Sequence, residues 1–351
     1  MPCITPQPPL LVRIIYWLKL IWMNNSVKLY LFLRRIYRYG YYVNRPTFTH
    51  TVSQRTLPSY WSPSTVEVYL PPYKSPSSKK CPLLFDIHGG GFALGHPTLD
   101  SQFNRYISNA ASCIVVALPY RKGPLLRWPV QIKELTALVE VVLQDVRISH
   151  LYDPERVAAA GFSAGGNLAT VLAIQPSLKG RIQSIVPIYP VLDWTITPAD
   201  KLAMRPSQVP ADVLRETADI FTFGYIPAGQ DREHPNLSPL YADPEDLPEN
   251  IYLVGCEYDM LNIDCINFYR KFGKLKRNVV YKEIKGAKHG FTHQNASRID
   301  IWENKRLDKL TVDLYGGIAE WLGDIWGEEK KTPHTPDVEK EGGFGDHIIL
   351  L

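Results

Sequence analysis

Residues 158–169 read AAAGFSAGGNLA, and this short stretch decides the fold. Residues 161–165 form the pattern G-x-S-x-G around Ser163, with apolar residues before it and small residues after it. That context predicts a buried strand, a sharp turn at Ser163 and a helix that passes close to the strand. A serine on such a turn is held in a strained backbone conformation. The alternative is a glycine-rich helix entry that only packs close to the sheet.

The segments around this turn alternate between strand and helix patterns. Strands are predicted at residues 64–72, 81–89, 112–120, 156–163, 182–190, 250–259 and 278–286. Helices are predicted at residues 129–146, 165–174, 265–275 and 308–326. Short apolar runs separated by helices are typical of a mainly parallel sheet covered by helices on both faces. We therefore expect an α/β fold with such a sheet at its centre.

Two parts of the chain fit no position in that alternation, and we assign them to a helical lid. Residues 196–235 are too long for a plain connection and contain a helical pattern at 211–223. Near the N-terminus, residues 10–23 and 27–39 predict two amphipathic helices. The expected organisation is N-terminal lid helices in 1–50, a core of 51–195 and 236–327, a lid insertion at 196–235, and a disordered tail at 328–351.

The first 65 residues differ in charge from the rest of the chain. They contain eight Lys or Arg and no Asp or Glu, within a formal net charge of +4 for the whole chain. A basic N-terminal segment followed by a mildly acidic remainder does not indicate a nucleic-acid-binding protein. It is compatible with contact between the basic segment and an anionic membrane surface. Helical spacing puts Arg13 and Lys19 on one side and an apolar set on the other. The apolar set consists of Leu11, Ile14, Leu18, Ile21 and Trp22.

The sequence leaves two interpretations of these N-terminal helices open. They either pack on the protein as part of the lid, or contact a membrane peripherally through residues 10–39, with a signal anchor as a variant of the second. The cations at 13 and 19 disfavour a clean membrane span. Five scattered cysteines without a CxxC pair indicate reduced thiols and a cytoplasmic location, with the endoplasmic reticulum membrane as the alternative. Because zinc-type His/Cys spacing is absent from the sequence, no metal is expected.

Ser163 is the predicted nucleophile, and the sequence offers a base and an orienting carboxylate for it. A serine hydroxyl is a weak nucleophile and needs a general base. His289 follows the last predicted strand in the loop KGAKHGF, and the alternative there is a surface histidine. Asp259, with Glu257 as the fallback, ends the preceding strand and would fix the imidazole tautomer, whereas Asp264 is expected to be structural. The order serine, aspartate, histidine is that of the α/β-hydrolase arrangement.

A run of three glycines supplies the remaining chemistry. Residues 85–95 read FDIHGGGFALG, in which the glycines follow a predicted strand. The N–H groups of Gly89 and Gly90 can face an oxyanion without an intervening Cβ, and Ala164, after the nucleophile, should supply a third donor. His88 is expected to hold the loop through a backbone hydrogen bond. The alternative is a flexible turn without a role.

Six motifs carry a resemblance to a known family. They are HGGGF, PYRKGPLLRWP, DPERVAAAGFSAGGNLA, SPLYA, GCEYDML and KHGF, in that order. Between residues 66 and 326 the chain resembles the hormone-sensitive-lipase-like branch of the α/β-hydrolase superfamily, most of all its fungal carboxylesterases. The resemblance implies a serine esterase that needs no cofactor, with a lid built from the N-terminus and residues 196–235. At the matching positions of this chain, the resemblance implies that Ser163, Asp259 and His289 form the catalytic triad. It likewise implies an oxyanion hole formed by Gly89, Gly90 and Ala164.

Two departures from the family pattern affect these expectations. The family commonly has an acidic residue before the nucleophile, where this chain has Phe162. We expect Phe162 to make the floor of the pocket more hydrophobic. The family also has Pro-Glu where Leu125 follows Pro124, which puts a structural hydrogen bond in doubt but not the triad.

The predicted function is hydrolysis of a carboxylic ester through an acyl-enzyme. A moderately hydrophobic small-molecule ester is the expected substrate, and a fungal secondary metabolite is suggested by the resemblance alone. Non-hydrolytic acyl transfer, a catalytically silent small-molecule binding protein and a membrane-anchored lipase or deacetylase are the alternatives. The oligomeric state stays open, with a homodimer as one option. Eight aromatic residues are expected in the lid, where they would line an apolar pocket, with core packing as the alternative for half of them: Tyr16, Trp17, Trp22, Tyr30, Phe32, Trp194, Phe221 and Phe223.

Overall fold

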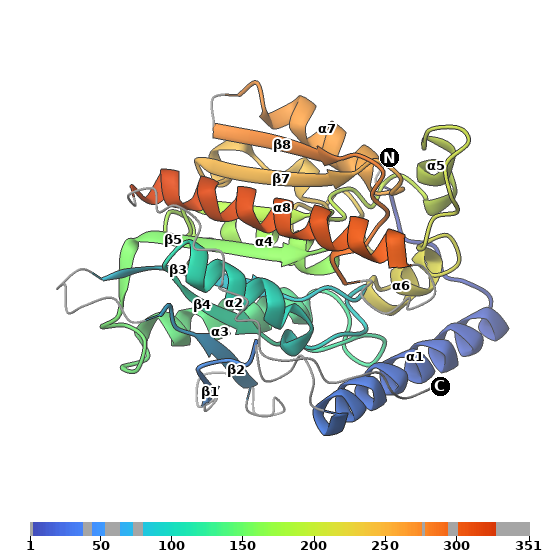
Figure 1. Ribbon diagram of the computed structural model, residues 1–351. Helices are drawn as coiled ribbons and strands as arrows, with labels where there is room; N and C mark the ends of the chain where they lie inside the picture. The colour runs from blue at the N-terminus through green and yellow to red at the C-terminus, as the bar shows by residue number, and fades with distance from the viewer. Residues whose placement is uncertain are drawn as a thin grey trace.

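An eight-stranded sheet organises the protein in the computed structural model, which describes residues 3–37, 44–52, 64–72, 80–275, 278–293 and 301–327 (Figure 1). The strands are β1 Phe48–Val52, β2 Ser64–Tyr69, β3 Cys81–Ile87, β4 Ile114–Leu118, β5 Tyr152–Phe162, β6 Ser184–Ile188, β7 Asn250–Cys256 and β8 Asn278–Ile284. The helices are α1 Leu10–Tyr37, α2 Ser101–Ala110, α3 Val130–Gln144, α4 Ala164–Ala173, α5 Pro198–Ala203, α6 Ala218–Tyr225, α7 Asn262–Phe272 and α8 Ile301–Trp326. Short 3₁₀ turns lie at Pro97–Asp100, Pro239–Tyr241, Pro244–Asp246 and Phe291–His293.

The sheet is mainly parallel, as the alternating pattern predicted. Its strand order is β1-β2-β4-β3-β5-β6-β7-β8, with antiparallel pairing in β1-β2 and β2-β4 and parallel pairing from β4 to β8. Parallel strands end at the same edge of a sheet. The segments after β3, β5, β7 and β8 therefore meet at one edge, and all the predicted site residues lie in those segments.

The core forms two layers, one on each face of the sheet. On β3, Leu83 and Phe85 face a cluster that includes α3, α4 and α7, while Leu84 faces a cluster that includes α2 and α8 (Figure 1). Successive side chains of a strand point to opposite faces, so a strand that is buried on both sides reads as a continuous apolar run. That rule explains why the apolar stretches in the sequence predicted these strands correctly.

Three elements escaped the sequence analysis. The edge strand β1 is short and half exposed, and it crosses the boundary drawn at residue 50 between lid and core. Helix α2 has a mean hydropathy too low to stand out, and α5 is only six residues long. The helix expected at 211–223 begins only at Ala218. One reason is Asp212, whose carboxylate accepts the backbone N–H groups of Leu214 and Met260 and so holds this segment in a non-helical turn.

The two helices expected near the N-terminus are one continuous helix, α1. Residues 24–26 between them contain neither glycine nor proline, and the Ser26 hydroxyl donates to the Trp22 carbonyl within the helix. Residues 38 and 39 of the second predicted helix, and the predicted tail at 328–351, lie outside the described residues.

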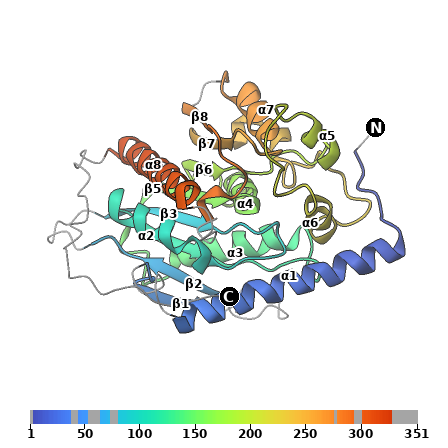
Figure 2. The same ribbon diagram turned by 45° about the vertical axis from the view of Figure 1, so that its right-hand side comes forward.

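Helix α1 packs against α6 along one edge of the molecule (Figure 2). Its contact side is formed by Leu20, which is fully buried beside Ile220 and Ala93, and by Tyr16, whose ring lies 5.7 Å from that of Phe223. Much of the apolar side singled out in the sequence stays exposed, at Leu11, Ile14, Leu18 and Trp22, although Ile14 and Leu18 also border a cavity between α1 and α6. Helix α1 thus packs on the protein through Leu20 and Tyr16, which lie outside the apolar set singled out in the sequence.

The backbone of α4 lies very close to the backbone of β3 at Gly165. A Cβ atom on Gly165 would fall well inside contact distance of the Ile87 carbonyl oxygen, which is backbone and cannot move away cheaply. Glycine at this position therefore lets α4 start directly above the strand ends, which fixes the place of the turn at Ser163.

We expect Gly165→Ala to lower the free energy of unfolding by at least about 2 kcal/mol, because the added methyl group overlaps the β3 backbone. Gly323→Ala on α8 is the matched control, since nothing lies within 4 Å of its added Cβ. That variant should gain roughly 0.5–1 kcal/mol from helix propensity. Urea unfolding followed by circular dichroism measures both. Equal stabilities of the two variants would contradict the close packing of α4 on β3.

Candidate active site

Ser163 lies on the turn between β5 and α4. Its backbone has φ 54° and ψ −115°, a region that residues other than glycine rarely adopt, and its N–H donates to the Ile188 carbonyl at 2.8 Å. A conformation of this kind costs on the order of 1–3 kcal/mol and persists only where the surroundings enforce it. Here the enforcing contacts are the β6 hydrogen bond and the packing of α4 on β3.

His289 and Asp259 lie within hydrogen-bond distance of this turn. The Nδ1 atom of His289 donates to Asp259 Oδ2 at 2.6 Å, which leaves Nε2 to accept the Ser163 hydroxyl at 2.8 Å. The side chain of His289 is 8% exposed and that of Asp259 is 1% exposed. The structure therefore brings together the three residues that the sequence predicted for the triad, in a hydrogen-bonded chain that can move a proton away from the serine.

The carboxylate controls the titration of the imidazole. Burial by itself lowers the pKa of His289, but the charge of Asp259, its hydrogen bond and the charge of Asp212 outweigh that effect and raise the pKa above its ordinary value. A raised pKa means that the site stabilises the imidazolium form. That is the form a general base reaches when it accepts a proton.

Backbone contacts join the segments that carry these two residues. The N–H of Tyr258 donates to the Ala287 carbonyl at 2.9 Å, and the Glu257 carboxylate accepts the N–H of Gly286 at 2.8 Å. Glu257, the fallback for the orienting carboxylate, is thus used to hold the loop that carries His289. The Leu261 N–H donates to Asp259 Oδ1 at 2.9 Å and fixes the carboxylate from the other side.

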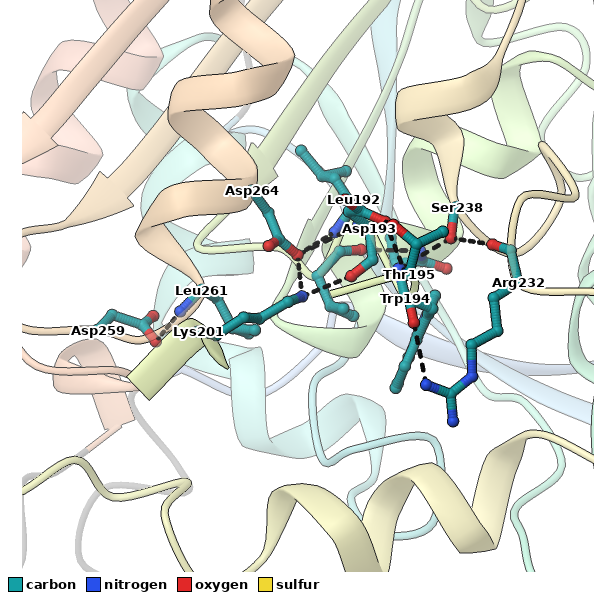
Figure 3. A network of polar contacts seen from close by, with 12 residues as sticks. Leu192, Asp193, Trp194, Thr195, Lys201, Arg232, Ser238, Asp259, Leu261 and Asp264 are labelled. Atoms are coloured by element: carbon teal, nitrogen blue, oxygen red, sulfur yellow. Dashed lines mark hydrogen bonds and ion pairs between the residues drawn. The ribbon is translucent and has the colours of Figure 1, made fainter. Parts of the chain in front are cut away.

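Asp264 lies on α7 and is structural, as the sequence analysis expected. Its Oδ2 atom accepts the N–H groups of Leu192 and Asp193 at 3.0 and 3.1 Å and the ammonium of Lys201 at 2.6 Å (Figure 3). Burial raises the pKa of Asp264 to about 6, against the lowering effect of Lys201. This buried ion pair ties α5 and α7 to the segment after β6, from which Trp194 reaches the pocket.

The glycine loop after β3 adjoins the serine. A Cβ on Gly89 would lie 3.0 Å from the Phe162 carbonyl oxygen and 3.6 Å from Ser163 Cβ, and Gly90 has a φ of 113°. In the described part of the chain, the N–H groups of Gly89, Gly90 and Ala164 donate to no protein oxygen, and all three residues line the pocket with Ser163. The arrangement suits stabilisation of a negative charge that develops beside the serine.

His88 holds this loop. Its Nδ1 atom donates to the Gly89 carbonyl at 2.7 Å, and its ring stacks on Tyr120 with the centroids 4.3 Å apart. Burial, followed by the charge of Lys122, lowers the pKa of His88 well below its ordinary value, so the ring stays neutral. The Tyr120 hydroxyl donates to the His88 carbonyl at 3.1 Å and completes the support.

A cavity of about 570 Å³ opens above Ser163 and His289. Tyr30, Trp194 and Phe221 of the eight predicted aromatic residues line it. Tyr16, Trp17 and Phe223 line a second cavity of about 610 Å³ between α1 and α6. Trp22 and Phe32 line neither and are exposed, so their assignment to an apolar pocket is wrong.

The two departures from the family pattern have visible consequences. Phe162 lines the catalytic cavity and packs edge-on against His293, with the ring centroids 4.9 Å apart, which gives the pocket floor the apolar character expected. Leu125 is 78% exposed. At the start of the same loop, the Arg121 N–H donates at 2.7 Å to the buried Glu134 carboxylate of α3.

Sequence reasoning missed two groups near the triad. Asp212, from the insertion at 196–235, binds the N–H of Met260 next to Asp259 and pairs with Arg205. His293 donates to Asp100 at 2.7 Å on the far side of Phe162, and both line the cavity. An acidic residue in a long insertion and a histidine four residues after the predicted base are weak signals, because only the folded chain brings them to the site.

The described residues hold no group of three or more His, Cys, Asp or Glu side chains arranged to bind a metal ion. In the same part of the chain, no helix combines the length and the apolar character that crossing a membrane requires. All five cysteines are free thiols.

The amino-acid sequence is similar to those of known proteins. Residues 84–293 match the model of a family described by the alpha/beta hydrolase fold. The chain is similar to an arylacetamide deacetylase of Oryctolagus cuniculus, with 31% identity over 196 residues that cover 50% of this chain and 48% of that protein. The aligned part thus spans about half the length of the rabbit relative. An acetyl esterase of Salmonella dublin is 26% identical over 243 residues, 68% of this chain and 72% of that protein.

A solved structure shows the same fold. The hyperthermophilic esterase from the archaeon Pyrobaculum calidifontis superposes with a TM-score of 0.69 over 92% of this chain and 99% of that chain. Its sequence identity of 23% supports a shared fold and no finer likeness.

We expect Lys201→Met to destabilise the protein by about 3–5 kcal/mol at pH 8, because Asp264 then lies buried without its counter-charge. The cost should shrink at pH 5. When a buried carboxyl has a higher pKa in the folded protein than its unfolded value of about 3.9, the protein loses stability as the pH rises between these two values. Removing Lys201 raises the folded pKa of Asp264 further, so the variant loses more stability than wild type over this range.

Urea unfolding of wild type and variant at both pH values measures this difference. Lys179→Met is the control, because Lys179 pairs with Asp246 on the surface and both side chains are largely exposed. Its unfolding midpoint should barely change at either pH. A pH-independent cost of Lys201→Met would contradict an ionised Asp264 held by Lys201.

Proposed function

Because the chain belongs to the hormone-sensitive-lipase-like family of α/β hydrolases, we propose that it is a serine carboxylic-ester hydrolase acting through an acyl-enzyme. One observation carries the proposal. Asp259, His289 and Ser163 form a continuous hydrogen-bonded chain that ends beside three N–H groups without a protein acceptor among the described residues. A nucleophile, a base, an orienting carboxylate and oxyanion donors are the complete set that acyl transfer requires.

The reaction follows from these positions. Ser163 Oγ attacks the ester carbonyl carbon while its proton passes to His289 Nε2, and Asp259 stabilises the imidazolium. The carbonyl oxygen becomes an oxyanion and accepts hydrogen bonds from Gly89, Gly90 and Ala164, each worth about 3–4 kcal/mol in the transition state. The imidazolium returns its proton to the leaving alcohol. Water, activated by the same histidine, then attacks the acyl-enzyme and releases the acid and the free serine.

The substrate we propose is a moderately hydrophobic ester with a short acyl group. The aromatic lining by Tyr30, Trp194 and Phe221 and the apolar floor at Phe162 support a hydrophobic molecule. The relatives that are named an arylacetamide deacetylase and an acetyl esterase support removal of an acetyl group. The narrower substrate, a fungal secondary metabolite, stays a prediction.

Of the alternatives, the silent binding protein fits least well, since the base is present and hydrogen-bonded to the serine. Transfer of the acyl group to an alcohol uses the same residues and differs only in the acceptor. Product analysis with and without an added alcohol distinguishes it from hydrolysis. A cytoplasmic location and a homodimer remain predictions.

We expect Ser163→Ala to lose at least about 10³-fold of the turnover of short-chain nitrophenyl esters, since no other residue replaces the nucleophile. Ser177→Ala, on an exposed serine after α4, is the control and should keep the wild-type rate. The assay uses a series from acetate to longer acyl chains and reports kcat and KM for each. Retention of most activity in Ser163→Ala would remove this serine from the mechanism.

The pH profile should report the raised pKa of His289. Because the base must be neutral, kcat/KM should rise with pH, with a midpoint above the usual value of about 6.5. Asp259→Asn removes the charge that outweighs burial, so the midpoint should move to lower pH and the plateau should fall by roughly 10³–10⁴-fold. Asp246→Asn, which removes an exposed carboxylate that pairs with Lys179 on the surface, is the control and should leave the midpoint in place. An unmoved midpoint in Asp259→Asn would argue against His289 as the base.

A further inference from the structure

Helix α1 carries an apolar stripe on its outer face. At about 100° per residue, nine large apolar side chains fall within an arc of roughly 100°. They are Leu11, Ile14, Ile15, Leu18, Trp22, Leu29, Phe32, Leu33 and Ile36. Every one is exposed, and all except Ile14 and Leu18, which border the second cavity, line neither cavity. Trp22 and Leu11 are 70% and 69% exposed. Soluble proteins rarely expose so many large apolar side chains in one continuous patch, so this stripe indicates an interaction surface.

The opposite face of α1 is already occupied by the protein. Leu20 is fully buried against Ile220 and Ala93, and Val27 lines the catalytic cavity. Figure 2 shows α1 along the edge of the molecule with α6 on its inner side, and no described helix or strand lies beyond it. Rotation of the helix to bury its stripe would expose Leu20 and open the cavity wall. The stripe therefore needs a partner from outside the described residues.

The charges beside the stripe identify the kind of partner. Lys19 and Lys28 are exposed and flank the stripe on its two sides, and residues 1–65 contain no acidic residue. An amphipathic helix of this composition, rich in Trp, Leu and Phe and edged by cations, is typical of helices that lie in the plane of a membrane interface. At 28 residues, or roughly 42 Å, α1 is long enough to lie along such a surface.

We infer that the outer face of α1 docks on the surface of a bilayer that contains anionic lipid. The apolar stripe enters the boundary between headgroups and acyl chains, and Lys19 and Lys28 contact anionic headgroups. A second copy of the chain is a poorer occupant. Two facing α1 helices would bring lysines together, and neither helix carries an acidic residue to neutralise them.

Docking would place the catalytic cavity beside the lipid. Val27 and Tyr30 of α1 line that cavity, so the helix that contacts the membrane is also one wall of the site. An ester dissolved in the bilayer could then reach Ser163 without crossing bulk water. This last step rests on the proposed esterase function, whereas the docking itself does not.

Vesicle sedimentation tests the docking with the full chain. We expect the protein to sediment with vesicles of phosphatidylcholine containing about 30% phosphatidylserine, and less with phosphatidylcholine alone. The triple variant Trp22→Ser/Leu29→Ser/Phe32→Ser, whose positions line neither cavity, should lose at least about tenfold in partitioning. Lys19→Glu/Lys28→Glu should lose about fivefold or more on the anionic vesicles.

The matched control removes as many exposed apolar side chains elsewhere. Leu125→Ser/Val146→Ser/Val312→Ser should partition like wild type. The α1 triple variant should hydrolyse nitrophenyl acetate in solution at the wild-type rate, which shows that the variant is folded. If wild type itself does not hydrolyse this ester, the result counts against the proposed esterase function and not against the docking. Wild type that stays in the supernatant, a triple variant that still sediments, or a dimer that the triple variant dissociates on gel filtration would each overturn the proposal.

Discussion

The structure depends on the close approach of α4 to the ends of β3 and β5. Gly165 lets the helix begin directly against the β3 backbone, and the chain can make that step only if Ser163 adopts a positive φ. The strain in this turn is balanced by the surrounding sheet, which is fixed by apolar side chains on both faces. The same close approach also brings the glycine loop after β3 beside the serine.

Around this turn, hydrogen bonds also hold the loops that carry the reacting groups. His88 and Tyr120 hold the glycine loop, Glu257 holds the loop of His289, and Lys201 with Asp264 holds the segment that carries Trp194. The N–H groups of Gly89, Gly90 and Ala164, which line the pocket, are left without protein acceptors among the described residues. Support of this kind keeps the donors oriented before a substrate arrives, which is how a site stabilises a developing charge without reorganising.

Helix α1 links the site to the outside of the molecule. Its inner face closes the cavity wall with Val27 and packs on α6 through Leu20, while its outer face presents the apolar stripe. Hydrophobic periodicity alone shows that a helix has an apolar side, but not which side the protein covers. That choice was made by the apolar contacts of Leu20 and Tyr16 with α6, which only the folded chain provides.

The sequence by itself determined seven of the eight strands and the triad candidates. In a parallel α/β fold, buried strands appear in the sequence as apolar runs, and the functional residues follow them directly. It also singled out Asp259 above Glu257. Only the tertiary structure decided what depends on contacts between distant segments. Asp212 and His293 reach the site from loops without a sequence signal, and Asp212 uses its carboxylate outside the helix that local propensity predicted. Such contacts arise only after folding, so no local pattern contains them.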